Sequence, residues 1–415
     1  SSSSSSPVSY SSAAAGSSSL AELNAAIPER EAWQAATNLK LNDFSFCVCN
    51  FVLDTGSKAE MLRYDAILEQ RSTVMDSVRQ NMGFVNRDDV YLMLDVDRNN
   101  IIQSTMQGVA GVRKGDLKKP LKVKFRGERG VDEGGVRKEF FQVILRELFD
   151  PKYAMFTYNE DSRLFFFSPD SFTAPIEFEL IGTLLGLAIF NSVILDVHFP
   201  RIVYHMLVGK CITLEHLKDL RPTVYKSFLQ LLSCDDASVV DLHFEFSRTT
   251  VFGEQVTEEL KEGGSNIPVT NDNREEFVDL YLQRFLYTSV KTSFDAFRRG
   301  FSKVCDTEVL DWFHPDEIEL LVCGSPSLDF ADLREGARYD GFEDDQQIIE
   351  DFWSVVFELS PEQQKQLLCF ATGSARAPIR GLSDLRMTVT RAGPDSDQLP
   401  TSHTCFNTLV IPEYS

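Results

Sequence analysis

The sequence predicts an α+β fold divided into at least two compact parts. Its 415 residues suffice for two or three domains, and its apolar share of 43% and charged share of 25% are typical of a globular chain. Apolar residues recur at helical spacing over most of the chain, whereas strand-like alternation appears at 121–125, 387–390 and 408–411. A stretch of small residues at 324–327 precedes a C-terminal unit of about 90 residues, a usual domain size.

The charge balance disfavours some partners. Lys and Arg number 41 and Asp and Glu number 62, so the formal net charge is −21. A chain this acidic repels nucleic acid and anionic membranes, and we expect neither as a partner. The longest apolar run, Leu180 to Leu195, is broken by Thr183 and Asn191 and is too short to span a bilayer. It predicts a buried core helix.

Cysteine usage indicates the compartment. Eight cysteines are scattered along the chain, no Asn-x-Ser/Thr sequon occurs and no signal peptide opens the sequence. We therefore expect a cytoplasmic or nuclear protein with reduced thiols. Cys47 and Cys49 are a weak metal-site candidate because no second Cys pair accompanies them, and no metal is expected.

The sequence predicts no regular structure at the N-terminus and helices after it. Residues 1–19 contain twelve serines and predict a disordered segment. Residues 20–40 show helical spacing interrupted by Pro28 and predict a helix that docks on the following domain, and 64–78 predict a longer helix. Residues 95–106 partly match a calcium loop but lack its glycine and its final glutamate, so calcium is not expected.

Residues 121–125 predict a strand that ends in a glycine-rich turn before a helix at 136–148. Four glycines in 127–135 have the interval of a phosphate-binding loop, but Val136 and Arg137 replace its Lys and Ser/Thr, which excludes a nucleotide site. The stretch from 113 to 138 carries ten basic and four acidic residues, a pattern typical of a solvated face.

An apolar stripe follows Pro222. Its members occur at helical spacing and predict either a core face or a groove for a loop of a partner on a small helical subdomain: Val224, Phe228, Leu231 and Leu232. Further along, Asn273 and Glu276 predict a capping box, and Pro315 with two acidic residues predicts a helix that ends at Gly324. Gly324, Ser325 and Pro326 are the best hinge candidate.

The C-terminal unit shows two helices and two strands. A helix is predicted around 348–357, and Ser360 with Gln363 predicts the capped start of another that stops at Gly373. Strands are predicted at 387–390 and 408–411.

Cys405 lies between these strands in a run of small polar residues, 400–407. Such flanks keep a thiol near water, as a nucleophile requires, although only roughly 3% of an unperturbed thiol is thiolate at neutral pH. In an extended segment His403 and Cys405 would share one face. By themselves, these residues fit a half-exposed structural cysteine about equally well.

Residues 399–407, followed by Leu409, Pro412 and Tyr414, resemble the active-site motif of HECT-class ubiquitin ligases. The resemblance extends over residues 41–415 and is closest to the founding subfamily. It is carried, in the order of the family, by 127–141, 195–200, 297–301, 317–324, 370–373 and 377–378.

The resemblance implies a bilobal HECT domain. A larger, mainly helical N-lobe would cover 41–323, with a subdomain at about 205–285 that binds a ubiquitin-conjugating enzyme. A smaller α+β C-lobe would cover 327–415, and the hinge at 324–326 lies where the family has its mobile linker.

The resemblance also implies site residues. Cys405 would carry ubiquitin as a thioester, and His403 and Thr404 would shape the surroundings of its thiol. The groove for the conjugating enzyme would use Val224, Phe228, Val240, Leu242 and Phe277. Three features depart from the family pattern: Cys234 replaces an aromatic groove residue, Arg380 replaces a glycine, and the sequence ends at Ser415, before the usual tail.

The expected function is therefore transfer of ubiquitin from a conjugating enzyme to Cys405 and then to lysines of a substrate protein, without a metal, nucleotide or redox cofactor. The alternative is a truncated module that binds the conjugating enzyme and ubiquitin but fails in the final ligation. A cysteine hydrolase using Cys405 and His403 is disfavoured because residues two apart in one strand seldom align as a dyad.

Overall fold

Two hydrophobic cores organise the residues that the computed structural model describes, which are 50–80, 90–128, 135–250, 253–342 and 347–414. The chain divides into a unit Ser1–Leu53, of which only a short 3-10 turn at Asn50–Val52 is described, and a unit Asp54–Ser415. The predicted disordered segment, the predicted helix at 20–40 and Cys47 and Cys49 lie outside the described residues.

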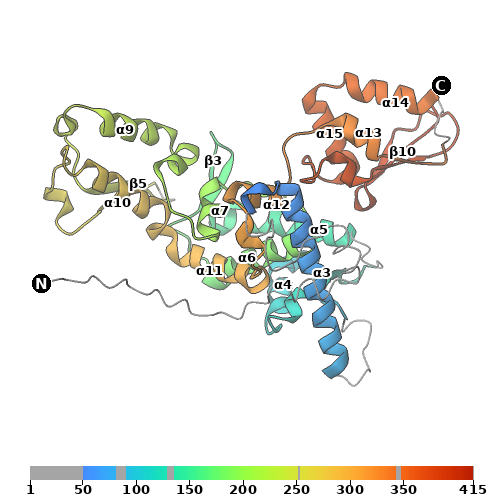
Figure 1. Cartoon of the computed structure of the whole chain (residues 1–415), viewed down its shortest axis with the longest axis horizontal. Coiled ribbons are helices and arrows are strands. Elements are labelled where there is room, and N and C mark those ends of the chain that lie inside the picture. The colour runs from blue at the N-terminus through green and yellow to red at the C-terminus, as the bar shows by residue number, and fades with distance from the viewer. Residues whose placement is uncertain (1–49, 81–89, 129–134, 251–252, 343–346, 415) are drawn as a thin grey trace, which may run out of the picture. The chain divides into compact units, whose positions relative to one another are not determined.

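The first core belongs to residues 54–323, which we call the large lobe (Figure 1). Its helices are α3 (Thr55–Gln80), α4 (Ile101–Val109), α5 (Gly135–Leu148), α6 (Pro175–Phe190), α7 (Arg201–Leu207), α8 (Leu217–Leu220), α9 (Pro222–Ser233), α10 (Arg274–Leu286), α11 (Lys291–Val304) and α12 (Pro315–Cys323). Its described strands form three separate pairs: β1 (Leu92–Val96) with β2 (Leu121–Phe125), β3 (Phe156–Asn159) with β4 (Leu164–Phe167), and β5 (Glu245–Thr249) with β6 (Gln255–Glu259). The pair β1–β2 is parallel and the other two are antiparallel.

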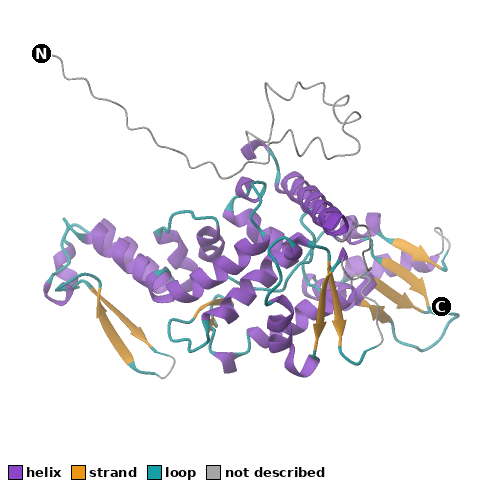
Figure 2. Cartoon of the chain, turned by 90° about the horizontal axis from the view of Figure 1, so that it is seen from below, coloured by secondary structure: helices purple, strands orange, loops and turns teal. Residues whose placement is uncertain are grey.

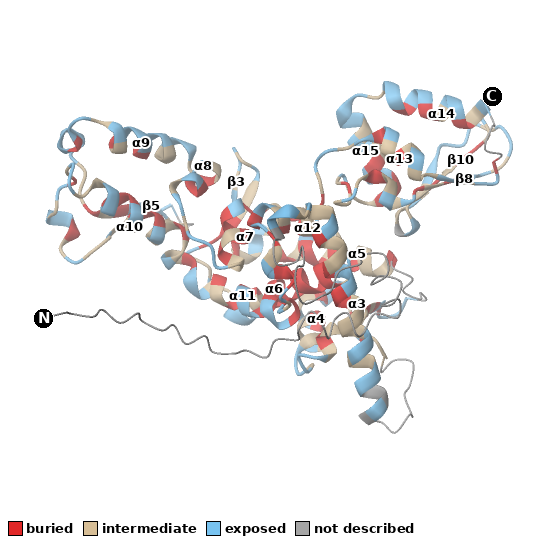
Figure 3. Cartoon of the chain, in the orientation of Figure 1, coloured by how far each residue is buried: buried red, intermediate tan, exposed pale blue. Residues whose placement is uncertain are grey.

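Helix α6 is the centre of the large lobe. Nearly every side chain from Phe178 to Phe190 is buried, as predicted for a core helix (Figure 3). The helix ends at Phe190, however, so the last five residues of the predicted apolar run, 191–195, are not helical. Its closest neighbour is α11, and glycines make that approach possible. A Cβ atom at Gly182 would lie 1.8 Å from the carbonyl oxygen of Phe297, and one at Gly300 would lie 1.8 Å from that of Glu179. The two helix backbones are therefore in direct contact.

The second core belongs to residues 324–414, which we call the small lobe. Helices α13 (Phe330–Gly336), α14 (Gln347–Glu358) and α15 (Pro361–Thr372) accompany strands β7 (Arg338–Asp340), β8 (Thr388–Arg391), β9 (Thr401–His403) and β10 (Thr408–Ile411). The strand order is β7-β8-β10-β9, with β9 antiparallel to β10 and the other pairs parallel. Figure 2 shows the helices and strands of the chain by colour. Side chains of α14, α15 and the sheet share the core, so the small lobe is α+β as predicted.

Several predicted helix boundaries are confirmed. Ser360 and Gln363 form the capping box of α15, and Gly373 ends that helix with a left-handed φ of 79°. Helix α12 begins at Pro315 with Gly324 as its C-cap. The strands predicted at 121–125 and 408–411 occur as β2 and β10.

Other local predictions are wrong. The carboxyl group of Asp54 accepts the backbone N–H of Ser57, so α3 begins well before the predicted residue 64. Asn273 does not cap α10, because its side-chain oxygen accepts the backbone N–H of Thr270 in the preceding turn. The chain also stops being extended at His403. Residues Thr404–Phe406 form a 3-10 turn, so strand alternation does not place Cys405 and His403 on one face.

Among the described residues, no helix combines the length and apolar character needed to cross a membrane.

Candidate active site

Cys405 lies in a short turn at the edge of the small-lobe sheet. Strand β9 leads into the 3-10 turn Thr404–Phe406, and Asn407 then reverses the chain with a left-handed φ of 50° before β10 begins. The antiparallel strands on either side pair His403 with Thr408. We call residues 404–407 the cysteine turn. The placement of the Cys405 side chain is outside the described part of the structure.

Asn407 fixes the end of the cysteine turn. Its side-chain amide donates to the carbonyl of Leu385 over 2.9 Å, and its own backbone carbonyl accepts the N–H of Thr388 over 3.0 Å. Its side-chain oxygen accepts a hydrogen bond from Nζ of Lys138 over 2.9 Å. The left-handed conformation that asparagine tolerates and these hydrogen bonds hold the backbone next to Cys405.

The residues flanking Cys405 differ in exposure. His403 and Phe406 are exposed, whereas Thr404 is half-buried near the end of α15. A Cβ atom at Gly373 would lie 3.6 Å from Cβ of Thr404, so that helix end is close to the turn. The exposed neighbours agree with the expectation that this part of the chain meets water. Roles for His403 and Thr404 stay predictions.

The structure places the five predicted groove residues at different depths in the subdomain that holds α9 and α10. Phe228 and Phe277 are buried, and their rings meet edge to face with centroids 5.8 Å apart. Val224 and Leu242 are half-buried, and Val240 is 52% exposed. Two neighbouring exposed residues, Leu229 and Val239, were not among the candidates because the resemblance implied only the other five positions.

Of these five candidates, the two phenylalanines therefore lie in the core, and Val224, Val240 and Leu242 leave some apolar surface accessible. Cys234 is half-buried and donates its Sγ–H to the carbonyl of Leu231 over 3.1 Å. Its own carbonyl accepts a hydrogen bond from Arg274 over 2.7 Å. Cys234 is thus held by hydrogen bonds to other residues of the same subdomain.

Backbone hydrogen bonds anchor the chain before and after the predicted hinge residue Gly324. The backbone N–H of Leu195 donates to the carbonyl of Val322 over 2.8 Å, which anchors the end of α12 in the large lobe. Ser325 and Ala377 exchange two backbone hydrogen bonds of 2.7 and 2.9 Å, which tie Ser325 to the small lobe. Gly324 lies between these anchors with a φ of 71°, and a Cβ there would come within 2.5 Å of the carbonyl oxygen of Ala377.

Arg380, the second departure from the family pattern, lies next to Gly381, whose φ of 107° is one that side-chain-bearing residues rarely adopt. Its guanidinium forms an ion pair of 3.4 Å with Glu60 on α3. Arg380 thus makes an exposed contact between the lobes, of a kind that contributes little free energy.

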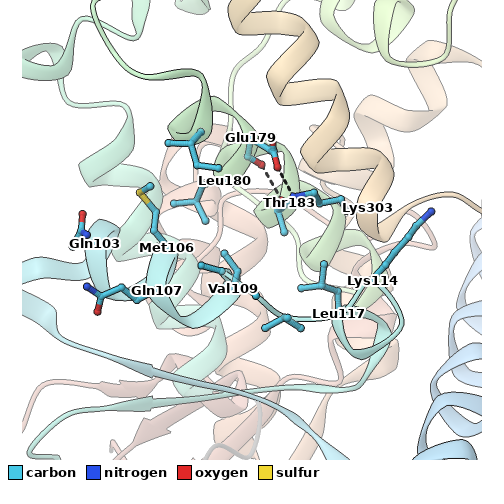
Figure 4. A pocket seen from close by; sticks show the side chains of 14 residues that line it. Gln103, Met106, Gln107, Val109, Lys114, Leu117, Glu179, Leu180, Thr183 and Lys303 are labelled. Atoms are coloured by element: carbon cyan, nitrogen blue, oxygen red, sulfur yellow. Dashed lines mark hydrogen bonds and ion pairs between the residues drawn. The ribbon is translucent and has the colours of Figure 1, made fainter.

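A separate cavity of about 620 Å³ lies in the large lobe between α4, the turn after it, α6 and α11 (Figure 4). Its walls are mostly apolar, and Lys303 and Glu179 form an ion pair at its edge. None of the predicted site residues is among its fourteen lining residues. The cavity is not part of the candidate active site.

Three histidines gather where α7, α12 and the turn before α8 meet. The ring centroid of His205 lies 4.3 Å from that of His216 and 6.0 Å from that of His314. Burial, and then the charge of His216, lower the pKa of His205 from 6.5 to about 4, and nearby Asp316 opposes the shift. Within the described residues, no group of at least three His, Cys, Asp or Glu side chains is arranged to hold a metal ion.

His205 is expected to make folding stability depend on pH. Its pKa in the folded protein is below the unfolded value, so the unfolded state binds more protons between these values, and stability falls as the pH drops from 6.5 to about 4. The unfolding temperature of His205→Gln should fall less over this range than that of the parent protein. His403→Gln, a change at an exposed position, serves as the control. Identical pH curves for parent and His205→Gln would refute the assignment.

Comparisons with known proteins give a consistent result. A family model described as "HECT-domain (ubiquitin-transferase)" matches residues 142–415. The chain is 40% identical over 379 residues to the human probable E3 ubiquitin-protein ligase HERC4, covering 89% of this chain and 36% of that protein. It is 36% identical over 404 residues to the mouse probable E3 ubiquitin-protein ligase HECTD2, covering 93% and 52%.

A more distant relative is the probable E3 ubiquitin-protein ligase HUL4 of Eremothecium gossypii, 32% identical over 417 residues that cover 95% of this chain and 49% of that protein. The chain thus spans between about a third and a half of the length of these relatives. Cys405 and the cysteine turn lie inside the matched range.

Proposed function

Because the chain belongs to the HECT-domain (ubiquitin-transferase) family, we propose that it is a ubiquitin-protein ligase that uses Cys405 as its nucleophile. The observation that carries this proposal is the placement of Cys405 in a turn between two paired strands, inside the range matched by the family model. The exposure of His403 and Phe406 on either side of the turn supports access by a large partner.

The proposed reaction has two steps. The thiolate of Cys405 attacks the carbonyl carbon of the thioester that joins ubiquitin to a conjugating enzyme. A new C–S bond forms, the old one breaks, and the cysteine of the conjugating enzyme leaves as a thiolate. The amine of a substrate lysine then attacks the thioester on Cys405. A C–N bond forms, the C–S bond breaks, and the proton lost by the amine balances the thiolate that leaves.

The first step exchanges one thioester for another, so the chain has to position two thiols and need not supply a large driving force. Three exposed apolar residues support a docking surface for the conjugating enzyme: Leu229 on α9, and Val239 and Val240 in the 3-10 turn that follows it. Burial of Phe228 and Phe277 beneath that surface keeps its shape fixed.

The proposal is tested by a charging assay with ubiquitin, activating enzyme and a panel of conjugating enzymes. We expect a product one ubiquitin heavier than the chain that disappears with thiol reductant and is absent from Cys405→Ala. His403→Ala is expected to retain the product. Absence of the product from the parent chain with every conjugating enzyme would refute the thioester mechanism.

The same assay separates ligation from the alternative of a binding module. Addition of free lysine or a substrate protein to the charged chain should discharge ubiquitin and yield a reductant-resistant product. A thioester that forms normally but yields no such product would favour the module that binds both partners without completing ligation.

A further inference from the structure

Two side chains of α5 in the large lobe reach the small lobe at the cysteine turn. Lys138 donates to the side-chain oxygen of Asn407 over 2.9 Å, and Gln142, one helical turn later, donates to the carbonyl of Gly373 over 2.8 Å. Gly373 is at the end of α15, close to Thr404. Residues at i and i+4 lie on the same side of a helix, so one edge of α5 contacts both parts of the small lobe that border Cys405.

Helix α5 is held in place by side chains that pack in the core of the large lobe. Phe140, Phe141, Ile144 and Leu148 on another side of the helix are buried in the core of the large lobe. A helix anchored by such side chains cannot shift without losing core packing. Lys138 and Gln142 therefore extend from a rigid element of the large lobe.

The two hydrogen-bond acceptors on the small lobe, Asn407 and Gly373, are part of the cysteine turn and of the helix end beside it. Asn407 also bonds to Leu385 and Thr388, so a contact to its side chain acts on the backbone of the cysteine turn. Gly373 has no side chain, and a Cβ there would approach Nε2 of Gln142 to 2.9 Å. The missing Cβ allows Gln142 to reach the carbonyl. Both contacts therefore depend on residues that also define the turn.

The contact supports the cysteine turn without covering it. Helix α5 meets the side formed by Thr404, Asn407 and Gly373, whereas His403 and Phe406 stay exposed. One of the two hydrogen bonds is exposed and the other is partly buried, so water competes for the same donors and acceptors. Such a contact forms and breaks easily, as a lobe that must meet two successive partners requires.

We infer that Lys138 and Gln142 are positioning residues that dock the small lobe on α5 for transfer of ubiquitin from Cys405 to the substrate lysine. The inference rests on the proposed function and adds the step at which this docking acts. During charging, a bound conjugating enzyme is present and itself brings its thioester to Cys405. After the conjugating enzyme has left, contacts within the chain must hold the cysteine turn in place.

The test is a single-turnover experiment on the full chain with Lys138→Ala combined with Gln142→Ala. Charging by the conjugating enzyme is measured first, and discharge of the isolated thioester to free lysine is measured separately. We expect charging within about twofold of the parent and discharge about tenfold slower, a factor that corresponds to about 1.4 kcal/mol. A general loss of structure would slow both steps, so the difference between the steps is the diagnostic result.

Two matched variants complete the experiment. The single variant Lys138→Arg keeps a charged donor and should discharge ubiquitin at nearly the rate of the parent chain. Arg146→Ala removes an exposed cation two turns further along the same helix and should leave both steps unchanged. Normal discharge by the double variant, or equal slowing of both steps, would overturn the inference while thioester formation still supports the proposed function. Failure of the parent chain to form a thioester would instead refute the proposed function.

Discussion

Alanine at Gly300 is expected to destabilise the large lobe by roughly 3 to 5 kcal/mol, near the upper end of what a single substitution costs. Its Cβ would lie 1.8 Å from the carbonyl oxygen of Glu179 and 2.9 Å from the backbone nitrogen of Thr183. Neither atom can rotate away, because both belong to α6. Intrinsic helix propensity favours alanine over glycine by about 1 kcal/mol, so the expected loss runs against the local preference.

The measurement is the free energy of unfolding in denaturant, with two comparisons. Gly182→Ala faces an equally short contact from the other helix and should cost a similar amount. Gly186→Ala meets mainly the side chain of Val304 at 2.9 Å and should cost less. If Gly300→Ala were as stable as the parent, or lost less than Gly186→Ala, the direct contact between the two helix backbones would be wrong.

Trp353→Ala is expected to destabilise the small lobe strongly while the large lobe keeps its stability. Trp353 is fully buried on α14, and its Nε1–H donates to the hydroxyl of Tyr339 over 2.8 Å. Removing a buried tryptophan costs roughly 3 to 5 kcal/mol. A unit of about 90 residues has only about 5 to 13 kcal/mol of stability in total, so one substitution removes a large share of it.

Hydrogen exchange read separately for the two lobes measures this effect. Hydrogen exchange should become much faster in β8 and β10 but stay slow in α6 and α11, and the fraction of the chain charged with ubiquitin should fall. Phe357→Ala serves as the control because Phe357 is on the same helix and 43% exposed. Loss of protection in both lobes together would show that the two cores unfold as one unit.

Local signals explain most of what the sequence predicted correctly. The capping box of Ser360 and Gln363 and the proline start of α12 depend on residues three or four apart, and both are found. Asn273 shows the limit of this approach. Its side chain could cap α10 or accept the N–H of Thr270, and the sequence does not reveal which competing hydrogen bond forms.

Contacts between distant residues could not be predicted from one sequence. Lys138 and Asn407 are 269 positions apart, and Gln142 and Gly373 are 231 positions apart. Lys138 was part of a basic run that suggested only a solvated face. The cysteine motif was found because its residues are contiguous. Strand periodicity failed within it because Asn407 and its neighbours form a tight turn, which no alternation pattern encodes.

The anchors on either side of Gly324 restrict how the lobes can rotate. Val322 is bonded to the large lobe, and the side chain of Cys323 is buried there against the carbonyl of Val197, whereas Ser325 is bonded to the small lobe. Any rotation that keeps these bonds must pass mainly through the two backbone dihedrals of Gly324. A joint with two degrees of freedom confines Cys405 to a curved surface around that residue and not to a volume. The local concentration of the thiol at any docking position on that surface is correspondingly high.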